Sequence, residues 1–413
     1  MEIAMVSEHA SPLACLGGVD AGGQNVHVAA LSIALAARGH RITVYTRADH
    51  PSLAGTVVLA PGVSVVHVPA GPAAEVPKDE LLPYMEPFAQ VLTQLWRCSP
   101  PDLVHAHFWM SGMASLRAAE SLALPVVQTF HALGTVKRRW QRTADGSPPD
   151  RVRIERDIVG AVDRVIATCS DEETELRRMG TFGTPVDVIP CGVDTESFTP
   201  DPGAANLCAP SRPRLLLVGR LVRRKGVEDA IRAMVDVPDG ELVIVGGPGV
   251  EMLPQDEEAQ RLTELARSLG VGARISFTGR VAHADLPALI NSCDLVLVVP
   301  WYEPFGIVPL EAMACGIPVV GTAVGGLLDT VVDGVTGLLV QPGRPSEIAA
   351  AVNRLLLDPA ARKQMGRAGR ARAETGYSWK SVAARTEESY RRTLGRRNLA
   401  AVRPGIATAG AGR

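Results

Sequence analysis

Two glutamates in the second half of the chain have the spacing and setting of a sugar-binding site. Glu303 follows the strand-like run DLVLVV after three residues, and Glu311 comes eight positions later in the string WYEPFGIVPLE. Pro304 and Gly306 turn the chain into a predicted helix. Carboxylates accept hydrogen bonds from neighbouring hydroxyls, such as those of a hexose or a ribose, and the N–H groups of Phe305 and Gly306 can serve an anion. The pattern favours a sugar-nucleotide site, although an isolated glutamate pair would more often cap or solvate a helix.

A glycine-rich loop near the N-terminus can bring backbone N–H groups close to a phosphate. It contains Gly17, Gly18, Gly22 and Gly23 and leads into a helix predicted to stop at Gly39. The spacing is not that of the G-x-G-x-x-G dinucleotide fingerprint, which argues against a nicotinamide enzyme. On the glycines alone, a mobile surface loop is an equally good interpretation.

The candidate residues must be positioned by strands, because ligands of open α/β sheets bind at the carboxyl ends of strands, beside helix N-termini. Short apolar runs alternate with helix-period segments in both halves, as expected for parallel strands joined by helical crossovers. The runs of the first half are Glu2–Ser7, Arg41–Thr46, Val63–Pro69, Leu103–His107, Pro125–Phe130, Arg164–Thr168 and Val186–Pro190. Those of the second half are Arg214–Gly219, Glu241–Gly246, Arg274–Gly279, Leu295–Pro300 and Pro318–Thr322.

The length of 413 residues suits two α/β domains. We expect an N-terminal domain over residues 1–200, a Pro- and Gly-rich linker over 201–213 and a C-terminal domain over 214–377. Residues 378–397 are predicted to form an amphipathic helix that packs back on the N-terminal domain. The tail over residues 398–413 is predicted to be disordered.

The composition is that of a globular protein without bulk affinity for nucleic acid or an anionic membrane. Hydrophobic residues make up 46% of the chain, charged residues 21%, and the net charge is −2. The seven cysteines are scattered, with no disulfide framework and no zinc-like spacing. No apolar run approaches the roughly 20 residues of a spanning helix, and no export signal is evident. We expect a cytoplasmic protein, with peripheral membrane contact and a homodimer left open.

Several motifs together resemble one family. The string from Glu303 to Glu311 resembles the Glu, seven residues, Glu signature of the retaining GT-B glycosyltransferases, which include sucrose-phosphate synthase, sucrose synthase and the mycothiol-pathway (D-inositol-3-phosphate) glycosyltransferase. VGRLVRRKG, FTGRV and GGLLDTVVDGVTG look like that family's donor-domain motifs, and DAGGQNVHV, HAHFWMSG and TFHALGTVKRR look like its N-terminal motifs. The resemblance covers nearly all of residues 1–395. It implies two Rossmann-like domains with parallel sheets that face each other across a cleft.

The resemblance also implies an activity. A hexose or N-acetylhexosamine would move, with retention of configuration, from a nucleotide diphosphate sugar to a small hydroxyl acceptor. The leaving phosphate would take the acceptor proton, so no protein nucleophile is needed. A sugar-nucleotide epimerase and a non-catalytic sugar-nucleotide binder of the same fold are the rival classes. An epimerase would need its own acid and base and would consume donor without an acceptor.

The leaving group requires cations in the donor site, because negative charge develops on the diphosphate as the glycosidic bond breaks. By the resemblance, Arg220 and Lys225 grip this diphosphate in place of a divalent metal, so no metal or other cofactor is expected. A solvated basic loop is the alternative for both residues. For Arg223 and Arg224, which lie between them, the solvated loop is the expectation.

The remaining donor roles follow from the resemblance. Glu303 would hold hydroxyls of the transferred sugar, Glu311 the ribose, and Arg280 would lie beside the base. His131 would lie over the donor sugar, where it positions the sugar rather than deprotonates. The expected catalytic residues are His131, Glu303, Arg220 and Lys225. The expected donor-binding set is Gly22, Gly23, Arg220, Lys225, Arg280, Glu303, Phe305, Gly306, Ile307 and Glu311.

The acceptor site is less well defined. Compared with the mycothiol branch, Phe108 lacks the hydroxyl of that branch's aromatic residue, and Ala132 replaces a threonine. Two phosphate ligands are therefore missing, which makes inositol phosphate the second-ranked acceptor. A basic run follows His131 and could bind a phosphorylated acceptor, touch a membrane or form a solvated helix face; it consists of Lys137, Arg138, Arg139 and Arg142. The expected acceptor residues are Asn25, Lys78, His107, Phe108, and Arg151 or Arg153.

Overall fold

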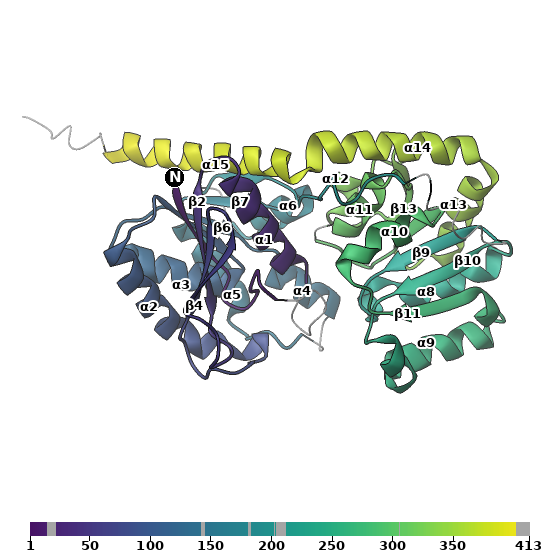
Figure 1. Cartoon of the computed structure of the whole chain (residues 1–413), viewed down its shortest axis with the longest axis horizontal. Helices are drawn as coiled ribbons and strands as arrows, with labels where there is room; N and C mark the ends of the chain where they lie inside the picture. Colours follow the sequence, from purple (N-terminus) through teal and green to yellow (C-terminus); the bar gives the residue numbers. More distant parts are fainter. Residues whose placement is uncertain are drawn as a thin grey trace, which may run out of the picture.

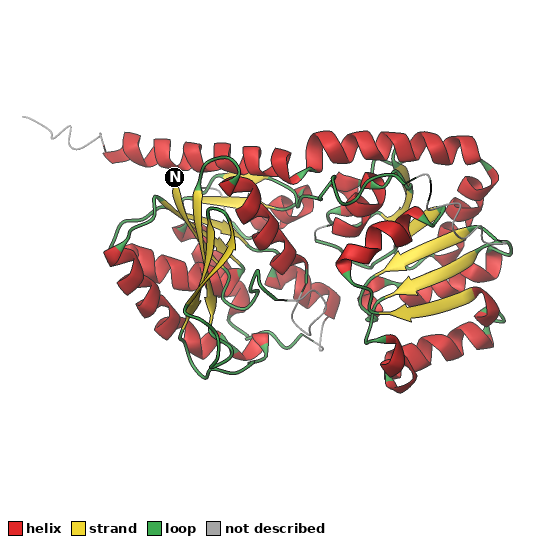
Figure 2. Cartoon of the chain, in the orientation of Figure 1, coloured by secondary structure: helices red, strands yellow, loops and turns green. Residues whose placement is uncertain are grey.

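The computed structural model describes residues 1–14, 22–141, 145–180, 183–201, 203, 212–304 and 306–401. Two α/β domains lie side by side, and in each a sheet is covered by helices (Figures 1 and 2). The strands are β1 Glu2–Val6, β2 Arg41–Arg47, β3 Thr56–Ala60, β4 Val63–Val68, β5 Leu103–His107, β6 Val126–Thr129, β7 Arg164–Ala167, β8 Val186–Val188, β9 Arg214–Val218, β10 Glu241–Val245, β11 Ile275–Gly279, β12 Leu295–Val298, β13 Val319–Thr322 and β14 Gly337–Val340. The α-helices are α1 Gly23–Ala36, α2 Met85–Cys98, α3 Trp109–Glu120, α4 Gly134–Gln141, α5 Arg151–Ala161, α6 Ser170–Arg178, α8 Val227–Ala233, α9 Glu257–Ser268, α10 Leu286–Asn291, α11 Ile307–Ala314, α12 Leu327–Thr330, α13 Pro345–Leu357, α14 Pro359–Arg372 and α15 Trp379–Ala401.

Both sheets are doubly wound, as the resemblance to Rossmann-like domains implies, and all strand pairs except β3 with β4 are parallel. The first runs β3-β4-β2-β1-β5-β6-β7-β8 and the second β11-β10-β9-β12-β13-β14. The chain order reverses between β1 and β5 in the first sheet, and between β9 and β12 in the second. Ligands of such sheets bind at these reversal points, beyond the carboxyl ends of the strands. The loops that follow β1, β5, β9 and β12 are therefore the places where a site is expected.

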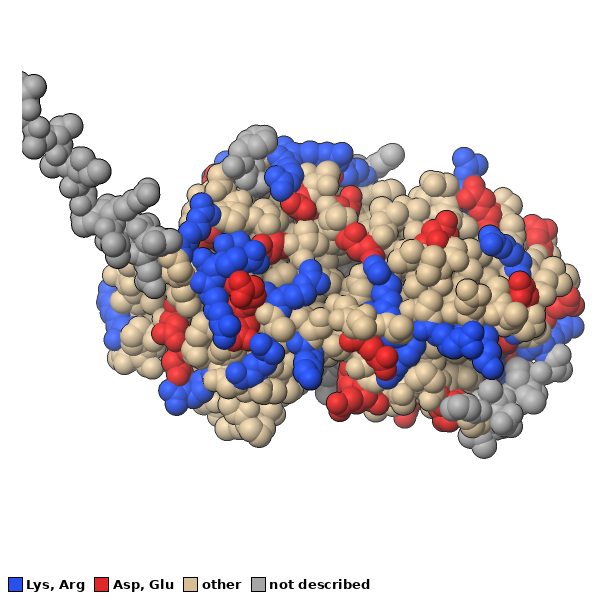
Figure 3. All heavy atoms as spheres, turned by 90° about the horizontal axis from the view of Figure 1, so that it is seen from above, with Lys and Arg blue, Asp and Glu red and all other residues tan. Residues whose placement is uncertain are grey.

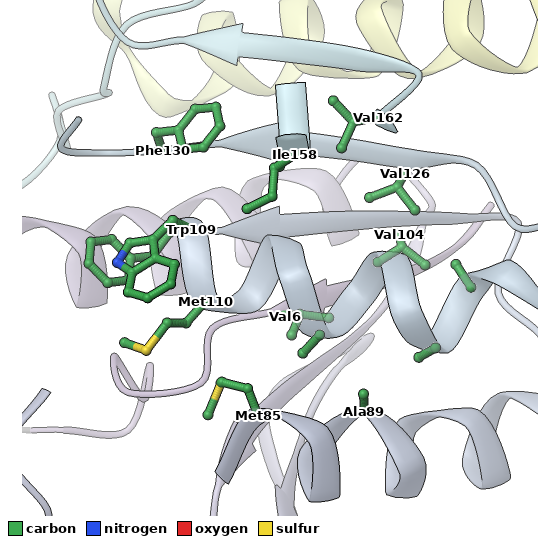
Figure 4. Close-up of a cluster of buried hydrophobic side chains, with 14 of the residues drawn as sticks. Val6, Met85, Ala89, Val104, Trp109, Met110, Val126, Phe130, Ile158 and Val162 are labelled. Carbon is green, nitrogen blue, oxygen red and sulfur yellow. The ribbon is translucent and has the colours of Figure 1, made fainter. Parts of the chain in front are cut away.

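The core of the first domain shows why its strands are continuous apolar runs rather than alternating ones. Helices cover both faces of the sheet, so every residue of β5 and β6 is buried. On one face, Val104 and Val126 lie in one buried cluster with residues of α3, and Met85 and Ala89 of α2 extend this cluster beyond α3 (Figure 4). The second sheet is also enclosed by a hydrophobic cluster on each face.

The predicted strand bounds agree with the structure to within two residues, but two strands are absent from the prediction. Both lie at sheet edges. The β3 strand pairs antiparallel with β4, and β14 pairs only with β13. Their apolar runs, TVVLA and GLLV, are only four or five residues long, and periodicity alone does not identify so short a run as a strand.

The last helix packs on the first domain, although it follows the second in the chain (Figure 1). Val382, Ala383 and Tyr390 of α15 are buried in one cluster with residues of α1, β1 and β2. The helix continues to Ala401, past the expected end at 397, so the beginning of the predicted tail is helical. Residues 402–413 lie outside the described residues, as does most of the expected linker. Before that linker, Val193 and Phe198 already pack in a cluster of the second domain.

The surface over α15 carries many basic side chains, interspersed with acidic ones (Figure 3). Arg38 and Arg391 both pair with Glu387, while Arg397 pairs with Asp163. This face therefore mixes both signs of charge. Among the helices of the described chain, none is long and apolar enough to cross a membrane.

Candidate active site

The predicted donor cation and carboxylate meet in the structure. Because β9 and β12 are neighbours in the second sheet, the loops that follow them lie side by side. The Lys225 Nζ atom donates a hydrogen bond of 2.5 Å to Glu303 Oε2. The two side chains are 20% and 10% exposed, so the pair is open to a ligand but largely withdrawn from solvent. One spot at the reversal point of the second sheet thus presents both a cation and a carboxylate.

Glycines allow these two loops to pack this closely. Gly226, directly after Lys225, has a φ of +70°, and a Cβ atom there would lie 1.9 Å from the carbonyl oxygen of Val299 at the end of β12. On the other side, Gly325 has a φ of +48°, and its Cβ atom would lie 2.3 Å from the Glu303 carbonyl oxygen. The Gly326 N–H donates to that oxygen at 2.8 Å. The Lys225 and Glu303 backbones are therefore fixed by close contacts that a side chain would prevent.

Arg224 departs from the expectation of a solvated loop residue. It is half-buried, and its carbonyl accepts a hydrogen bond of 2.8 Å from the Trp301 N–H. Burial lowers the pKa of its guanidinium, which the nearby charge of Glu303 opposes and that of Arg220 reinforces. Arg224 therefore belongs to the charge cluster of the site. The run of three cations in the sequence gives no sign of which one turns inward.

The other two arginines of this loop are exposed. Arg223 is exposed as expected. Arg220 is exposed too, and it makes no hydrogen bond or ion pair through its side chain with any residue that the structure describes. Its guanidinium therefore remains available to an anion.

The second glutamate has a partner that the sequence analysis missed. Glu311, on α11, is buried, and its Oε1 atom lies 2.8 Å from His283 Nε2. This hydrogen bond raises the pKa of His283. Arg280, three positions before His283, is exposed, and its place beside the base stays a prediction. Gly306 caps α11 with a left-handed φ of +67°, followed by Ile307 as the first helical residue, while Phe305 lies outside the described residues.

His131 belongs to a cluster of four buried histidines in the first domain. The His131 Nε2 atom lies 2.9 Å from His107 Nδ1, and the two rings stack with their centroids 5.1 Å apart. His27 packs edge-on to His131, and His105 packs against His107. Burial lowers the pKa of His27 to about 4 and that of His105 to about 3, and it holds the pKa values of His107 and His131 well below 6.5. All four rings are neutral at pH 7.

Two aromatic residues of the final helix, α15, contact this histidine cluster. Tyr390 Oη lies 2.7 Å from His105 Nδ1, and the Trp379 ring packs edge-on to His27 at 5.5 Å. A sequence signal existed for part of the cluster, since His105 and His107 alternate along β5 and so point to one face of the sheet. The described residues contain no group of three or more His, Cys, Asp or Glu side chains that could hold a metal ion.

The glycine loop is only partly described. Residues 15–21 lie outside the described residues and include Gly17 and Gly18. Gly22 caps α1 and Gly23 begins it. Asn25 stabilises this start: its Oδ1 accepts from the Gly22 N–H at 3.0 Å, and its Nδ2 donates to the Ser11 carbonyl at 2.9 Å. Both ends of the Asn25 amide are thus used within the protein.

The structure brings three of the predicted acceptor residues together and leaves a fourth apart. The Lys78 Nζ atom lies 5.9 Å and the Arg151 guanidinium 5.1 Å from the centre of the Phe108 ring. Arg153 is exposed on α5, where it pairs with Asp150 and Asp157. No contact of the described residues links Arg153 to the other three.

The basic run after His131 is largely neutralised. Lys137 pairs with Asp145 at 3.1 Å, and Arg139 with Glu175 at 2.8 Å. The Arg138 guanidinium donates to the Pro149 carbonyl. Arg142 lies outside the described residues. These pairings favour a structural role for the described part of the run over binding of a phosphorylated acceptor.

The two domains touch next to Glu303. Tyr302 stacks on Trp140 of α4, with ring centroids 6.3 Å apart, and packs against the core of the first domain. Figure 1 shows α4 on the side of the first domain that faces the second. Ser170 N and Oγ both donate to the Asp329 carboxylate, at 2.6 and 2.7 Å. The site in the second domain is therefore flanked by contacts with the first.

Comparison with known proteins shows to which family this two-domain architecture belongs. Residues 205–372 match the family Glycosyl transferases group 1, and residues 21–197 match Glycosyltransferase Family 4. The D-inositol 3-phosphate glycosyltransferase of Nocardiopsis dassonvillei is 37% identical over 393 residues, or 91% of each chain. The structure of sucrose-phosphate synthase from Thermosynechococcus elongatus is similar with a TM-score of 0.87 at 33% identity, over 96% of this chain and 99% of that one. That of HepE from Anabaena in complex with UDP-glucose has a TM-score of 0.72 at 22% identity, over 96% and 100%.

The two facing α/β domains are those of the GT-B fold, and the class of protein is a glycosyltransferase. Given the family matches and the full-length relative, the chain belongs to the glycosyltransferase group 1 family and is a transferase enzyme.

Proposed function

We propose that this enzyme transfers a hexose or N-acetylhexosamine, with retention of configuration, from a nucleotide diphosphate sugar to a small hydroxyl acceptor. The observation that carries the proposal is the contact between Lys225 and Glu303 at the reversal point of the second sheet. A sugar diphosphate needs a carboxylate for its hydroxyls and a cation for its phosphates, a few ångströms apart. HepE, which shares the fold, has been solved with UDP-glucose, so the architecture can accommodate such a donor.

In this proposal the cations act on the leaving group. As the bond from the sugar C1 to the diphosphate oxygen breaks, negative charge grows on that oxygen, and Lys225, Arg224 and Arg220 stabilise it. The acceptor oxygen forms the new bond to C1, and its proton passes to the departing phosphate. The positive charge of these side chains is the reason to propose that no metal is required. A chelator is then expected to leave turnover unchanged.

The other residues position the sugar. Glu303 accepts hydrogen bonds from hydroxyls of the transferred sugar. Glu311 accepts hydrogen bonds from the ribose hydroxyls, while its Oε1 atom also contacts His283 Nε2. His131 is neutral, so it offers hydrogen bonds to the sugar without adding a charge. This fits a role in positioning rather than in proton removal.

The acceptor is the least constrained part of the proposal. Relatives named D-inositol 3-phosphate glycosyltransferase make an inositol phosphate the second candidate. Peripheral membrane contact and a homodimer stay predictions.

We predict that the melting temperature rises on addition of one nucleotide diphosphate sugar from a panel of uridine, guanosine and adenosine donors. A ligand at about 100 times its Kd adds about 2.7 kcal/mol to the free energy of unfolding. Donor turnover followed by mass spectrometry, with the product anomer assigned by NMR, then tests the reaction. An inverted anomer would contradict retention. An isomerised donor without acceptor would point to an epimerase, and binding without any donor consumption to a non-catalytic binder.

A further inference from the structure

The predicted acceptor residues surround a buried aromatic ring. Phe108 follows β5, with a left-handed φ of +81°, and only 4% of it is exposed. A positive φ is rare and costly for an aromatic residue, so the surrounding contacts must hold it in place. Lys78 and Arg151 flank the ring, as described above, and the His9 ring meets it edge-on with centroids 4.8 Å apart.

Each of the three nitrogens of the Arg151 guanidinium already donates a hydrogen bond within the protein. Arg151 Nε donates to Glu155 Oε1 at 2.8 Å, Nη1 to Ser147 Oγ at 3.1 Å, and Nη2 to the Ala132 carbonyl at 2.5 Å. Its side chain is 2% exposed. A phosphate that drew Arg151 away from Glu155 would leave this buried carboxylate with the Gly134 N–H but without its ion-pair partner, which is unfavourable.

The other cations near the Phe108 ring also have carboxylates close to them. Lys137 has Asp145 at 3.1 Å and Asp79 at 3.4 Å, and Asp79 is the residue directly after Lys78. Glu8, at the carboxyl end of β1, adds another buried carboxylate on the His9 side of the ring. The four carboxylates Asp79, Asp145, Glu155 and Glu8 thus outnumber the three cations Lys78, Lys137 and Arg151, and a doubly charged phosphate would find no net positive field here.

Beside the Phe108 ring, His9 offers a hydrogen-bond acceptor for a neutral hydroxyl. His9 Nδ1 lies 2.7 Å from Glu8 Oε1, and the other Glu8 oxygen accepts from Ser111 Oγ. A Glu8 carboxylate oxygen accepts a hydrogen bond from Nδ1–H, and in that tautomer Nε2 carries the lone pair. That atom has no hydrogen-bond partner among the residues that the structure describes, and 9% of the His9 side chain is exposed.

We infer that the acceptor is an uncharged polyol or sugar, and that one of its hydroxyls donates a hydrogen bond to His9 Nε2, beside Phe108. This inference rests on the proposed function and narrows its acceptor. It separates this chain from its relatives that are named for a phosphorylated sugar or cyclitol.

The test is a set of matched acceptors, namely the free and monophosphorylated forms of myo-inositol, fructose and glucose, each supplied with the donor that stabilises the enzyme. For the best pair, the kcat/KM of the free form is expected to exceed that of the phosphorylated form by at least about tenfold, because a buried charge without partners costs more than that factor. Equal use, preference for the phosphorylated form, or donor hydrolysis without transfer to any free form would overturn the inference. Absence of donor binding and hydrolysis would instead refute the proposed function.

The role of His9 is tested by two substitutions in the same assay. His9→Phe keeps the ring contact with Phe108 but removes the hydrogen bond, so the acceptor KM is expected to rise about tenfold while the donor KM changes little. His9→Gln retains a side-chain acceptor and should recover part of that loss. Arg117→Ala, at an exposed position on α3, is the matched control and should resemble the wild type. An unchanged acceptor KM in His9→Phe would remove His9 from the acceptor site.

Discussion

Replacing Lys225 by alanine is expected to lower the kcat/KM for the sugar donor by about 100- to 1,000-fold. This is the range found when one group that stabilises developing negative charge is removed. Two effects add in the same direction here. The diphosphate loses a cation, and Glu303, which now accepts a 2.5 Å hydrogen bond from Lys225 Nζ, loses the partner that fixes its orientation. Steady-state kinetics with varied donor measure the change.

The matched control is Arg223→Ala. Arg223 lies two positions away in the same 3-10 helix, carries the same charge and is exposed. The kcat/KM of Arg223→Ala for the donor should stay within about twofold of the wild-type value. Water screens an exposed charge, so Arg223 contributes little to binding of the diphosphate. Equal losses in the two variants would mean that general basicity, rather than the contact with Glu303, supports donor binding. Near-normal turnover of Lys225→Ala would refute the phosphate assignment.

The second large effect is a steep loss of stability in mild acid. Each of the four clustered histidines stays neutral in the folded protein near neutral pH, whereas in the unfolded chain it takes up a proton near pH 6.5. Below that pH the unfolded state binds more protons, so the free energy of unfolding falls as the pH falls. Each ring contributes about 1.4 kcal/mol per pH unit, and four contribute up to about 5 kcal/mol per unit until the folded rings begin to titrate, at about pH 4 for His27. Since a domain has about 5–15 kcal/mol of stability, unfolding is expected near about pH 5.

Buried carboxylic acids moderate this effect. Burial raises the pKa values of Glu155 and Glu172, so the folded protein takes up protons there before the unfolded chain does. Denaturant unfolding at a series of pH values between about 7.5 and 5 gives the slope. His27→Phe keeps a ring against Trp379 and should reduce the slope by about 1.4 kcal/mol per pH unit. His50→Asn, at an exposed position, should leave it unchanged. A flat profile would show that the cluster is already protonated in the folded state.

The central strands and the main donor pair were predictable from the sequence for physical reasons. A strand buried on both faces is largely apolar, so the runs RLLLV and LVLV that became β9 and β12 stand out. Glu303 and Lys225 follow two such runs, and the doubly wound order makes those runs neighbours. The resemblance of the flanking motifs to a family then identified which charged residues to choose.

Residues defined only by tertiary contacts were not predictable. Arg224 and Arg223 are identical in type and adjacent in sequence, yet Arg224 is half-buried beside Trp301 and Arg223 is exposed. His283 meets Glu311 across 28 positions, and no periodic pattern joins them. Likewise, the sequence offers Arg151 and Arg153 equally, yet α5 buries the first and exposes the second. The side on which a helix packs depends on its neighbours, which local patterns do not specify.

The most direct test of the account compares two ligands in one variant. Calorimetric titration of the wild type and of Glu303→Gln should be carried out with the nucleotide diphosphate sugar and with the nucleotide diphosphate alone. If the Glu303 carboxylate binds the transferred sugar, the substitution weakens binding of the sugar nucleotide by about tenfold or more and leaves that of the free nucleotide within about twofold. An equal loss of affinity for both ligands, or no loss for either, would contradict the assignment of Glu303 to the sugar and with it the proposed donor site.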